Sequence, residues 1–136
     1  WAYTQRMLRV LSLVLPLSMF SACAADESIP KFVDPTAQYH LVELDGEPFT
    51  AMATIAFPEA GQVIGQAPCN RYFATQTVPY PWFGLDGIGA TEMACADLPA
   101  EATYFAALAD MTLAEVVGDT LILSNPTGRQ LVFQAR

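Results

Sequence analysis

The chain is poor in the residues that most metal sites and nucleic-acid-binding surfaces need. It has one histidine, His40, and its three cysteines include no C-x-x-C pair, so a four-ligand zinc site is hard to assemble. Only six Lys and Arg stand against 14 Asp and Glu, which gives a net charge of −8. So few cations cannot neutralise a run of phosphates, and we therefore expect no nucleic-acid partner. We also expect no metal and no cofactor.

The sequence also lacks the short motifs of common enzyme classes. It contains no Gly-rich phosphate loop, nucleophile elbow or H-E-x-x-H segment. A Cys–His nucleophile would need His40 beside a cysteine, but His40 falls inside an alternating, strand-like run. Glu43, Asp45 and Glu47 straddle a turn, where we expect them to be solvated. We therefore predict a protein without catalytic residues.

Residues 1–22 are typical of a secretory signal preceded by some upstream sequence. Met7 is the start that we expect, and an apolar run over 10–20 is shorter than the roughly 20 residues that span a bilayer. The sequence F-S-A-C that ends at Cys23 then resembles a bacterial lipobox with Phe in place of the usual Leu. It predicts that Cys23 carries a lipid as the first mature residue; ordinary cleavage nearby would leave it a free thiol.

The expected location is the periplasmic side of the cell envelope. Ala24 rather than Asp follows Cys23, which by resemblance to lipoprotein sorting rules favours the outer membrane. Buried acyl chains contribute about 0.8 kcal/mol per CH₂, so such an anchor is effectively permanent. Residues 23–35 have few helix or strand signals and are predicted to be a tether, and 36–136 form one domain that we expect to be a monomer.

Alternation of apolar and polar residues predicts a mainly β domain. Short strand-like runs are separated by Gly, Pro, Asp and Asn turns, and we expect strands over 39–44, 51–57, 62–65, 72–78, 85–90, 113–117, 120–124 and 130–134. The last three form a meander. About seven or eight antiparallel strands favour a small barrel-like, curved sheet, closed so that no edge is left open.

One helix is expected between Asp97 and Asp110. Asp97 can cap its start, Pro99 suits its first turn, and Glu101 favours the positive end of the helix dipole. Helical spacing places four residues on one stripe, which we expect to be the buried face: Ala102, Phe105, Leu108 and Ala109.

Two short motifs, G-x-x-x-C-N-R-Y and T-x-M-A-C, stand in the middle of the domain. Their residues are Gly65, Cys69, Asn70 and Arg71 in the first, and Thr91, Met93, Ala94 and Cys95 in the second. Together they resemble the signature of the META domain family, which includes the HslJ-like heat-shock proteins. The resemblance covers residues 38–133 and implies a β-barrel-like sheet with one helix packed against it. One departure is Ala74, where the family commonly has Gly.

Cys69 and Cys95 remain as an even pair if Cys23 is lipidated. They could form a disulfide, hold a metal, supply a catalytic thiol or stay as two buried thiols. A disulfide is the favoured interpretation, because the compartment is oxidising and the motifs flank what look like adjacent strands. Such a bond would close a loop of about 25 residues and contribute roughly 3–4 kcal/mol.

The residues after Cys69 have both structural and binding interpretations. Asn70 is expected to stabilise a turn through nearby backbone. Arg71 is one of four cations after residue 23, and we expect it to form an ion pair with Glu92 that clasps the two motifs. The alternative is that Arg71 binds a carboxylate or phosphate of a ligand.

Aromatic residues gather in the segment 79–84, which two prolines exclude from regular strand pairing. We expect Tyr80, Trp82 and Phe83 to close one end of the core, and a binding lip is the alternative.

The expected function is that of a non-catalytic, lipid-anchored envelope protein. The META resemblance implies a part in envelope stress or drug tolerance, through the family's heat-shock and novobiocin-resistance associations, exerted by binding a protein or lipid component. The alternative is a small-ligand or lipid-binding barrel with an internal pocket, which an apolar opening beneath Trp82 would favour.

Overall fold

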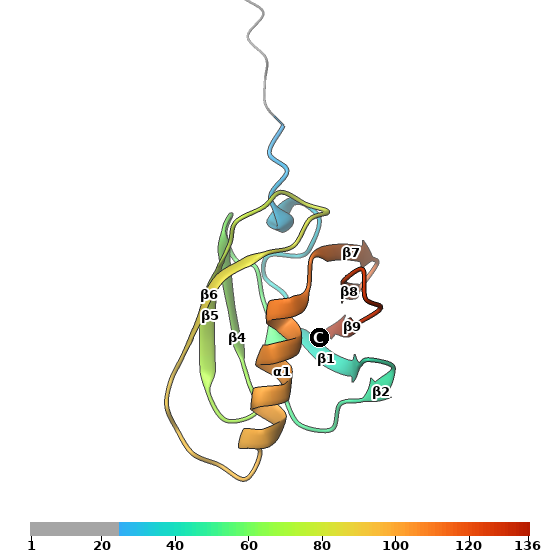
Figure 1. The fold of residues 1–136 in the computed structure, drawn as a ribbon. Coiled ribbons are helices and arrows are strands. Elements are labelled where there is room, and N and C mark those ends of the chain that lie inside the picture. Colours follow the sequence, from blue (N-terminus) through green and yellow to red (C-terminus); the bar gives the residue numbers. More distant parts are fainter. Residues whose placement is uncertain (1–24) are drawn as a thin grey trace, which may run out of the picture.

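The computed structural model describes residues 25–136, which fold into two antiparallel sheets and one α-helix (Figure 1). The smaller sheet has the order β4-β5-β6, formed by Gln62–Gln66, Arg71–Gln76 and Leu85–Ala90. The larger sheet has the order β2-β1-β9-β8-β7, with β3 paired to β1. Its strands are β1 Tyr39–Leu44, β2 Glu47–Pro48, β3 Thr54–Ile55, β7 Leu113–Val117, β8 Thr120–Ser124 and β9 Gln130–Ala135.

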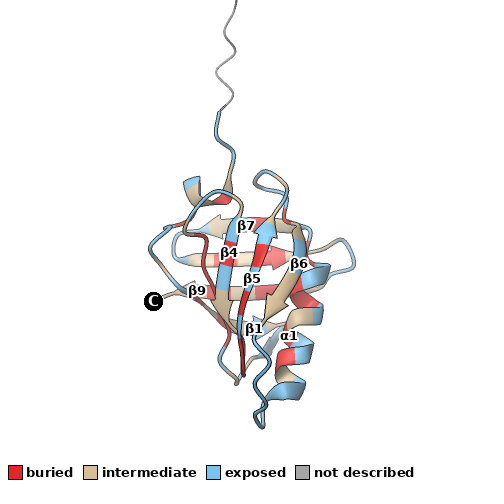
Figure 2. Ribbon diagram, turned by 90° about the vertical axis from the view of Figure 1, so that its left-hand side faces the viewer, coloured by how far each residue is buried: buried red, intermediate tan, exposed pale blue. Residues whose placement is uncertain are grey.

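The two sheets form layers around one core. In Figure 2, β4 and β5 lie in front of strands of the larger sheet that run across them, and strands of both layers carry buried positions. One cluster of buried residues joins the two sheets. Every second residue of β8 and β9 is buried, as the two-residue period of a strand requires. Burial of each large apolar side chain stabilises the folded state by about 1.5–3 kcal/mol. The largest fully buried side chains of these two strands are Leu121, Leu123, Leu131 and Phe133.

The expected mainly β, antiparallel fold with one helix is confirmed, but the expected barrel closure is wrong. Within residues 25–136 there are nine strands in two sheets that do not close on each other.

The two edges of the larger sheet are protected in another way. Strand β2 is only two residues long and ends in Pro48, and the edge of β7 is bonded by the 79–84 segment: Ala114 N–H donates to Pro81 O at 2.8 Å, and Phe83 N–H to Thr112 O at 2.8 Å.

Four strands, β1, β6, β7 and β8, have the bounds that alternation predicts, and the pairing of β7, β8 and β9 confirms the meander. The run 51–57 is the exception. Only Thr54 and Ile55 pair with β1, after which Ala56 forms a bridge to Ile64 in the smaller sheet. This segment therefore passes from one sheet to the other, which is why it is buried on both sides from residue 53 to 57.

Helix α1 spans Leu98–Asp110, with Pro99 in its first turn as expected. The predicted cap is wrong, because the Asp97 side chain makes no capping hydrogen bond; its carbonyl oxygen accepts the Glu101 N–H at 2.9 Å instead. The predicted stripe is also rotated from the real one: Ala102 and Ala109 are exposed. The buried residues of the helix are Glu101, Tyr104, Ala107 and Leu108. Within the described part of the chain, no helix combines the length and the apolar character needed to cross a membrane.

The packed domain begins before residue 36. A short 3-10 helix, η1, spans Ile29–Lys31, and Ile29 and Val33 belong to the core. The Asp34 N–H donates to the Tyr39 hydroxyl at 3.1 Å, which fixes the segment against β1. Of the described residues, only 25–28 precede the first core side chain.

Gly65 in β4 has a position that no larger residue fits. A Cβ at this site would meet the Thr54 carbonyl oxygen and lie 2.6 Å from Cε1 of Tyr72. We expect Gly65→Ala to lower the free energy of unfolding by roughly 1–3 kcal/mol, measured by urea denaturation. Gly84→Ala is the matched control, because its Cβ would lie 3.4 Å from Val78 Cγ2, an ordinary contact. Equal stability of the two variants would contradict this explanation.

Candidate functional site at the junction of the two motifs

The two motifs meet at one end of the domain, beside the start of α1. In Figure 1 the turn between β4 and β5 and the segment between β6 and α1 both lie at the lower end of the molecule. Cys69 and Cys95 form a disulfide there, with their Cα atoms 5.7 Å apart and a separation of 26 positions in sequence. The favoured interpretation of these cysteines is thus confirmed. Cys69 is buried, whereas Cys95 lies in an exposed segment.

Glu101 binds the turn of the first motif from the first turn of α1. Its Oε2 accepts the N–H groups of Cys69 and Asn70, each at 2.8 Å, and its Oε1 accepts the Asn70 side-chain Nδ2 at 2.7 Å. Glu101 is only 6% exposed. A buried carboxylate is tolerated when donors replace the water that it loses, and here three donors do so. Sequence reasoning assigned Glu101 to the helix dipole and missed this contact.

Asn70 connects the first motif to the second. Its Oδ1 accepts the Thr91 hydroxyl at 3.0 Å and the Met93 N–H at 2.6 Å, and its Nδ2 also donates to the Met93 carbonyl at 3.1 Å. These partners lie more than 20 residues away along the chain, so Asn70 joins distant segments rather than only stabilising its own turn. Asn is suited to this position because it presents an acceptor and two donors on one short side chain.

The hydrogen bonds from the first motif lower the pKa of the Glu101 carboxyl. Burial raises the pKa of the carboxyl, but the hydrogen bonds from the Asn70 side chain and from the N–H groups of Cys69 and Asn70 together outweigh burial, so the pKa lies below its ordinary value. The carboxylate is therefore charged at neutral pH, and both of its oxygens accept hydrogen bonds from the first motif. It is a structural acceptor and not a free acid or base.

A second buried cluster supports the motif from behind. The Tyr72 hydroxyl donates to the Thr54 carbonyl at 2.7 Å and lies 2.7 Å from the Tyr104 hydroxyl. The Thr54 hydroxyl accepts the Gln66 N–H at 2.9 Å. Burial raises the pKa of both tyrosines well above the ordinary value, so neither phenol ionises at physiological pH. Gly65 and Tyr72 of the first motif are thus placed by packing on Thr54.

The expected ion pair between Arg71 and Glu92 is wrong. The ion pairs among residues 25–136 are Lys31–Asp26, Arg129–Asp45 and Arg129–Asp110. Arg71 and Glu92 are both exposed, where a pair of charges contributes about 0–1 kcal/mol. The clasp between the motifs is made by the disulfide and by Asn70 and Glu101, which leaves Arg71 facing solvent.

Arg71 borders an apolar hollow on the outer face of β4 and β5. The hollow has a volume of about 370 Å³. Phe73 is 64% exposed and Ile64 39% exposed, and both line this hollow, so they form a patch of exposed apolar surface. The lining residues are Gln38, Thr54, Ala56, Ile64, Gly65, Gln66, Arg71, Tyr72 and Phe73. An apolar floor beside a cation suits an apolar group that carries a negative charge.

The aromatic residues of the 79–84 segment have different environments. Phe83 is 3% exposed and closes the core, as expected. Tyr80 stacks on Phe32 with ring centroids 4.1 Å apart, and its hydroxyl accepts the Val116 N–H at 3.3 Å. Trp82 alone of the three is turned outward, at 57% exposed.

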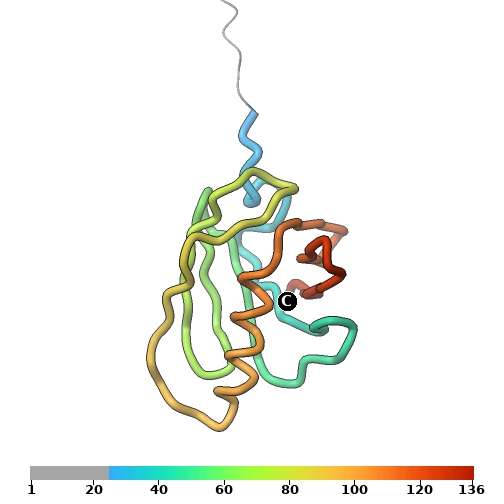
Figure 3. Tube along the Cα trace, viewed as in Figure 1, coloured from blue at the N-terminus to red at the C-terminus, as the bar shows by residue number. Residues whose placement is uncertain are grey.

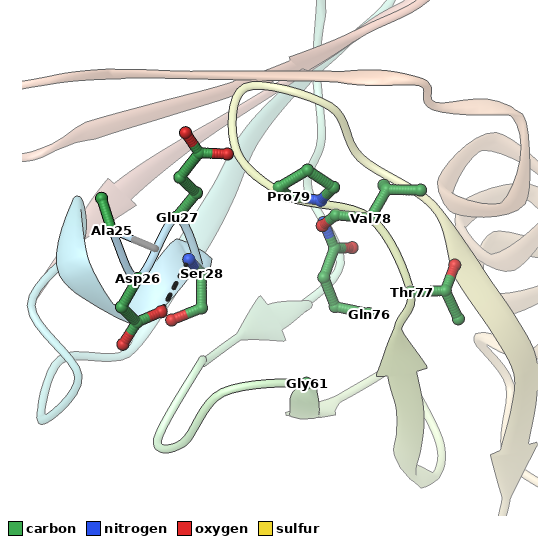
Figure 4. A pocket seen from close by; sticks show the side chains of 9 residues that line it. All are labelled: Ala25, Asp26, Glu27, Ser28, Gly61, Gln76, Thr77, Val78 and Pro79. Carbon is green, nitrogen blue, oxygen red and sulfur yellow. Dashed lines mark hydrogen bonds between the residues drawn. The ribbon is translucent and has the colours of Figure 1, made fainter. Parts of the chain in front are cut away.

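The described part of the chain gives no support to an internal ligand pocket. The space between the sheets is filled by the core side chains, and the hollows lie at the surface. One of them, shown in Figure 4, lies between residues 25–28 and residues 76–79. Trp82 lines neither this hollow nor the one beside Arg71. Cys23, the expected lipidation site, lies outside the described residues.

We expect Glu101→Gln to lower the free energy of unfolding at pH 7 by about 1–3 kcal/mol, because an amide nitrogen would face donors that now bind a carboxylate. The lowered pKa of Glu101 also fixes the pH dependence. Its contribution is present above the ordinary value of about 4.5 and is lost as the pH falls through the folded-state pKa.

The difference in stability between the wild type and Glu101→Gln should therefore shrink on acidification, measured by urea denaturation at pH 7 and at about pH 3. Glu115→Gln, at an exposed position of β7, is the control and should change little. A difference that stays constant across this range would contradict a charged, hydrogen-bonded Glu101.

Comparison with known proteins agrees with the motifs and the fold. A model of the META domain family matches residues 33–136. An NMR structure of a protein is 20% identical with a TM-score of 0.61, covering 77% of this chain and 92% of that chain. An NMR structure of a protein from Burkholderia xenovorans is 21% identical with a TM-score of 0.59, covering 85% and 93%. At these identities the two structures show the fold alone.

No curated protein matches the chain. The family model, in contrast, spans nearly the whole described domain, including Gly65, Cys69, Asn70 and Cys95. The chain therefore belongs to the META domain family.

Proposed function

We propose that this protein is a non-catalytic, lipid-anchored monomer of the cell envelope that contributes to envelope stress or drug tolerance by binding a protein or lipid component there. Membership of the META domain family supports an envelope-type protein. The observation that carries the proposal is the Cys69–Cys95 disulfide. Disulfides persist in oxidising compartments such as the bacterial periplasm and are rare in the cytosol.

The remaining cysteine supports the anchor. With Cys69 and Cys95 bonded to each other, Cys23 is the one cysteine left for a lipid, and it stands at the end of an F-S-A-C sequence after a short apolar run. The proposed anchor position is the outer membrane, because Ala24 follows Cys23.

The chemistry at the motif junction supports a non-catalytic role. The two thiols are bonded, the Glu101 carboxylate is occupied by three donors, and Tyr72 and Tyr104 keep their protons. A general base or nucleophile needs a free group within reach of a substrate, and these groups are either bonded or buried. We therefore assign the motif residues to holding the fold.

The apolar hollow beside Arg71 is the surface that we propose for binding. Phe73 and Ile64 are exposed apolar side chains that line the same hollow, and contiguous exposed apolar surface often marks a contact site. Arg71 adds a cation to a protein of net charge −8. An apolar segment with an acidic group is the partner chemistry that fits.

Removal of the anchoring thiol tests the proposed location. In a Gram-negative host, the wild type should partition with the membrane fraction and carry the mass of an attached lipid, whereas Cys23→Ser should appear in the soluble periplasmic fraction. The control is the double variant Cys69→Ser and Cys95→Ser, which keeps Cys23 and should stay with the membrane. Wild-type protein without a lipid would contradict the anchor.

The binding surface is tested by complementation. A strain that lacks the protein should lose tolerance to heat or novobiocin, and the wild type should restore it. Combined Phe73→Ser and Arg71→Ser should restore it less, because both the apolar and the charged contacts of the hollow are lost. Val117→Ser, which removes a 58% exposed apolar side chain from β7, is the matched control. Full complementation by the Phe73 and Arg71 variant would contradict the assigned surface.

A further inference from the structure

The exposed aromatic side chains of this domain include a group at the end where the described chain begins. Trp82 is 57% exposed and Phe32 44% exposed, and Phe32 stacks on Tyr80. The Tyr80 N–H donates to Glu27 O at 2.8 Å, which ties this group to residues 25–28. In Figure 1 the blue start of the chain, η1 and the 79–84 loop lie together at the upper end. Figure 4 shows Pro79 and Val78 across a hollow from Ala25 and Ser28.

The connection from this end to the proposed anchor is short. Ile29 is fixed in the core, and Cys23 precedes it by six residues, which span at most about 20 Å when fully extended. A domain of this size has a radius of gyration of about 13 Å. A lipid on Cys23 would therefore hold the end that carries Trp82 closer to the bilayer than any other part of the domain.

We propose that the face formed by Phe32, Tyr80 and Trp82, which we name the tether-end aromatic face, rests on the bilayer surface with the Trp82 ring in the headgroup region. This inference rests on the proposed function, since it needs the chain to be anchored near Cys23. Tryptophan favours membrane interfaces because its large apolar ring carries one polar N–H. Anchoring makes the contact intramolecular, so a small aromatic face is sufficient to orient the domain.

The charges at this end determine which lipid suits the contact. Residues 25–36 contain three acids, Asp26, Glu27 and Asp34, and one cation, Lys31, which lies 3.8 Å from Asp26. An acidic rim is repelled by anionic headgroups, and salt screens this repulsion. The contact is therefore apolar in origin and favours neutral lipid.

The orientation has a consequence for the rest of the molecule. The motif junction, at the start of α1, lies at the end opposite the entry of the described chain, as the tube in Figure 3 shows. With the tether-end aromatic face on the bilayer, the motif junction points away from the membrane. The apolar hollow beside Arg71 would then remain accessible to a partner in the periplasm.

Trp82 is itself the probe. The sequence has two tryptophans, and Trp1 precedes Cys23, so the chain 23–136 contains Trp82 alone. All core side chains lie within 29–133, so this chain keeps the whole fold. The Cys23 thiol is coupled to a maleimide lipid in phosphatidylcholine vesicles with brominated acyl chains. We expect a blue-shifted emission and at least a twofold loss of fluorescence relative to vesicles without bromine.

The control moves the single tryptophan to the motif junction at the opposite end by combining Trp82→Phe with Met93→Trp, at a side chain that is 62% exposed, and it should give no quenching. Trp82 emission typical of water, in vesicles that flotation shows to carry the protein, would overturn the proposed face. Replacing a third of the lipid with phosphatidylglycerol should reduce the quenching at low salt, and added salt should restore it. Stronger quenching with the anionic lipid would contradict an apolar contact.

The two proposals fail in different ways. Chemical coupling at Cys23 does not depend on lipidation in the cell, so loss of quenching in floating vesicles contradicts the orientation and leaves the anchor standing. Quenching in the coupled sample, together with a native protein that carries no lipid, supports the affinity of the face for the bilayer and contradicts the anchor.

Discussion

The Glu101 carboxylate accepts three hydrogen bonds from Cys69 and Asn70 in a site that water hardly reaches. A charge in such a place is costly unless donors surround it, so the helix cannot leave this position without exposing a carboxylate and two backbone N–H groups that lack partners. The helix is thereby fixed to the turn between β4 and β5. Asn70 extends the same network to Thr91 and Met93, and the disulfide closes it from the other side.

This network and the packing beside Thr54 give a physical reason for Gly65, Asn70 and the two cysteines. Gly65 leaves room for the Thr54 carbonyl and the Tyr72 ring, and Asn70 bonds both neighbouring segments. These contacts are structural, and they account for how the motifs hold the fold of a META domain together. The surface of the domain has two different ends: one carries exposed aromatic side chains beside the start of the described chain, and the other carries the motif junction.

The sequence predicts those features that depend on local pattern. Alternation places β1, β6, β7 and β8 correctly, and a pair of cysteines in suitable motifs indicates the disulfide. It does not predict the role of Glu101, because an acid in the first turn of a helix looks the same whether it faces solvent or binds a distant turn. For the same reason helical spacing predicts the wrong buried face of α1. Glu101 and the hydroxyl of Tyr104 are polar groups that are buried because they have hydrogen-bond partners in the core. The separation into two sheets that do not close into a barrel, and the packing of Ile29 in the core, depend on contacts between segments far apart in sequence. The periodicity of apolar residues does not report such contacts.

Amide hydrogen exchange at Cys69 and Asn70 tests the central claim most directly. Both N–H groups lie in a turn, where an unbonded amide exchanges quickly. Because both donate to the buried Glu101 carboxylate, the account predicts protection comparable to that of β8 and β9 in the core, and retention of that protection after the disulfide is reduced. Exchange at the rate of an exposed turn in the oxidised protein would show that Glu101 does not hold the motif, and would contradict the account.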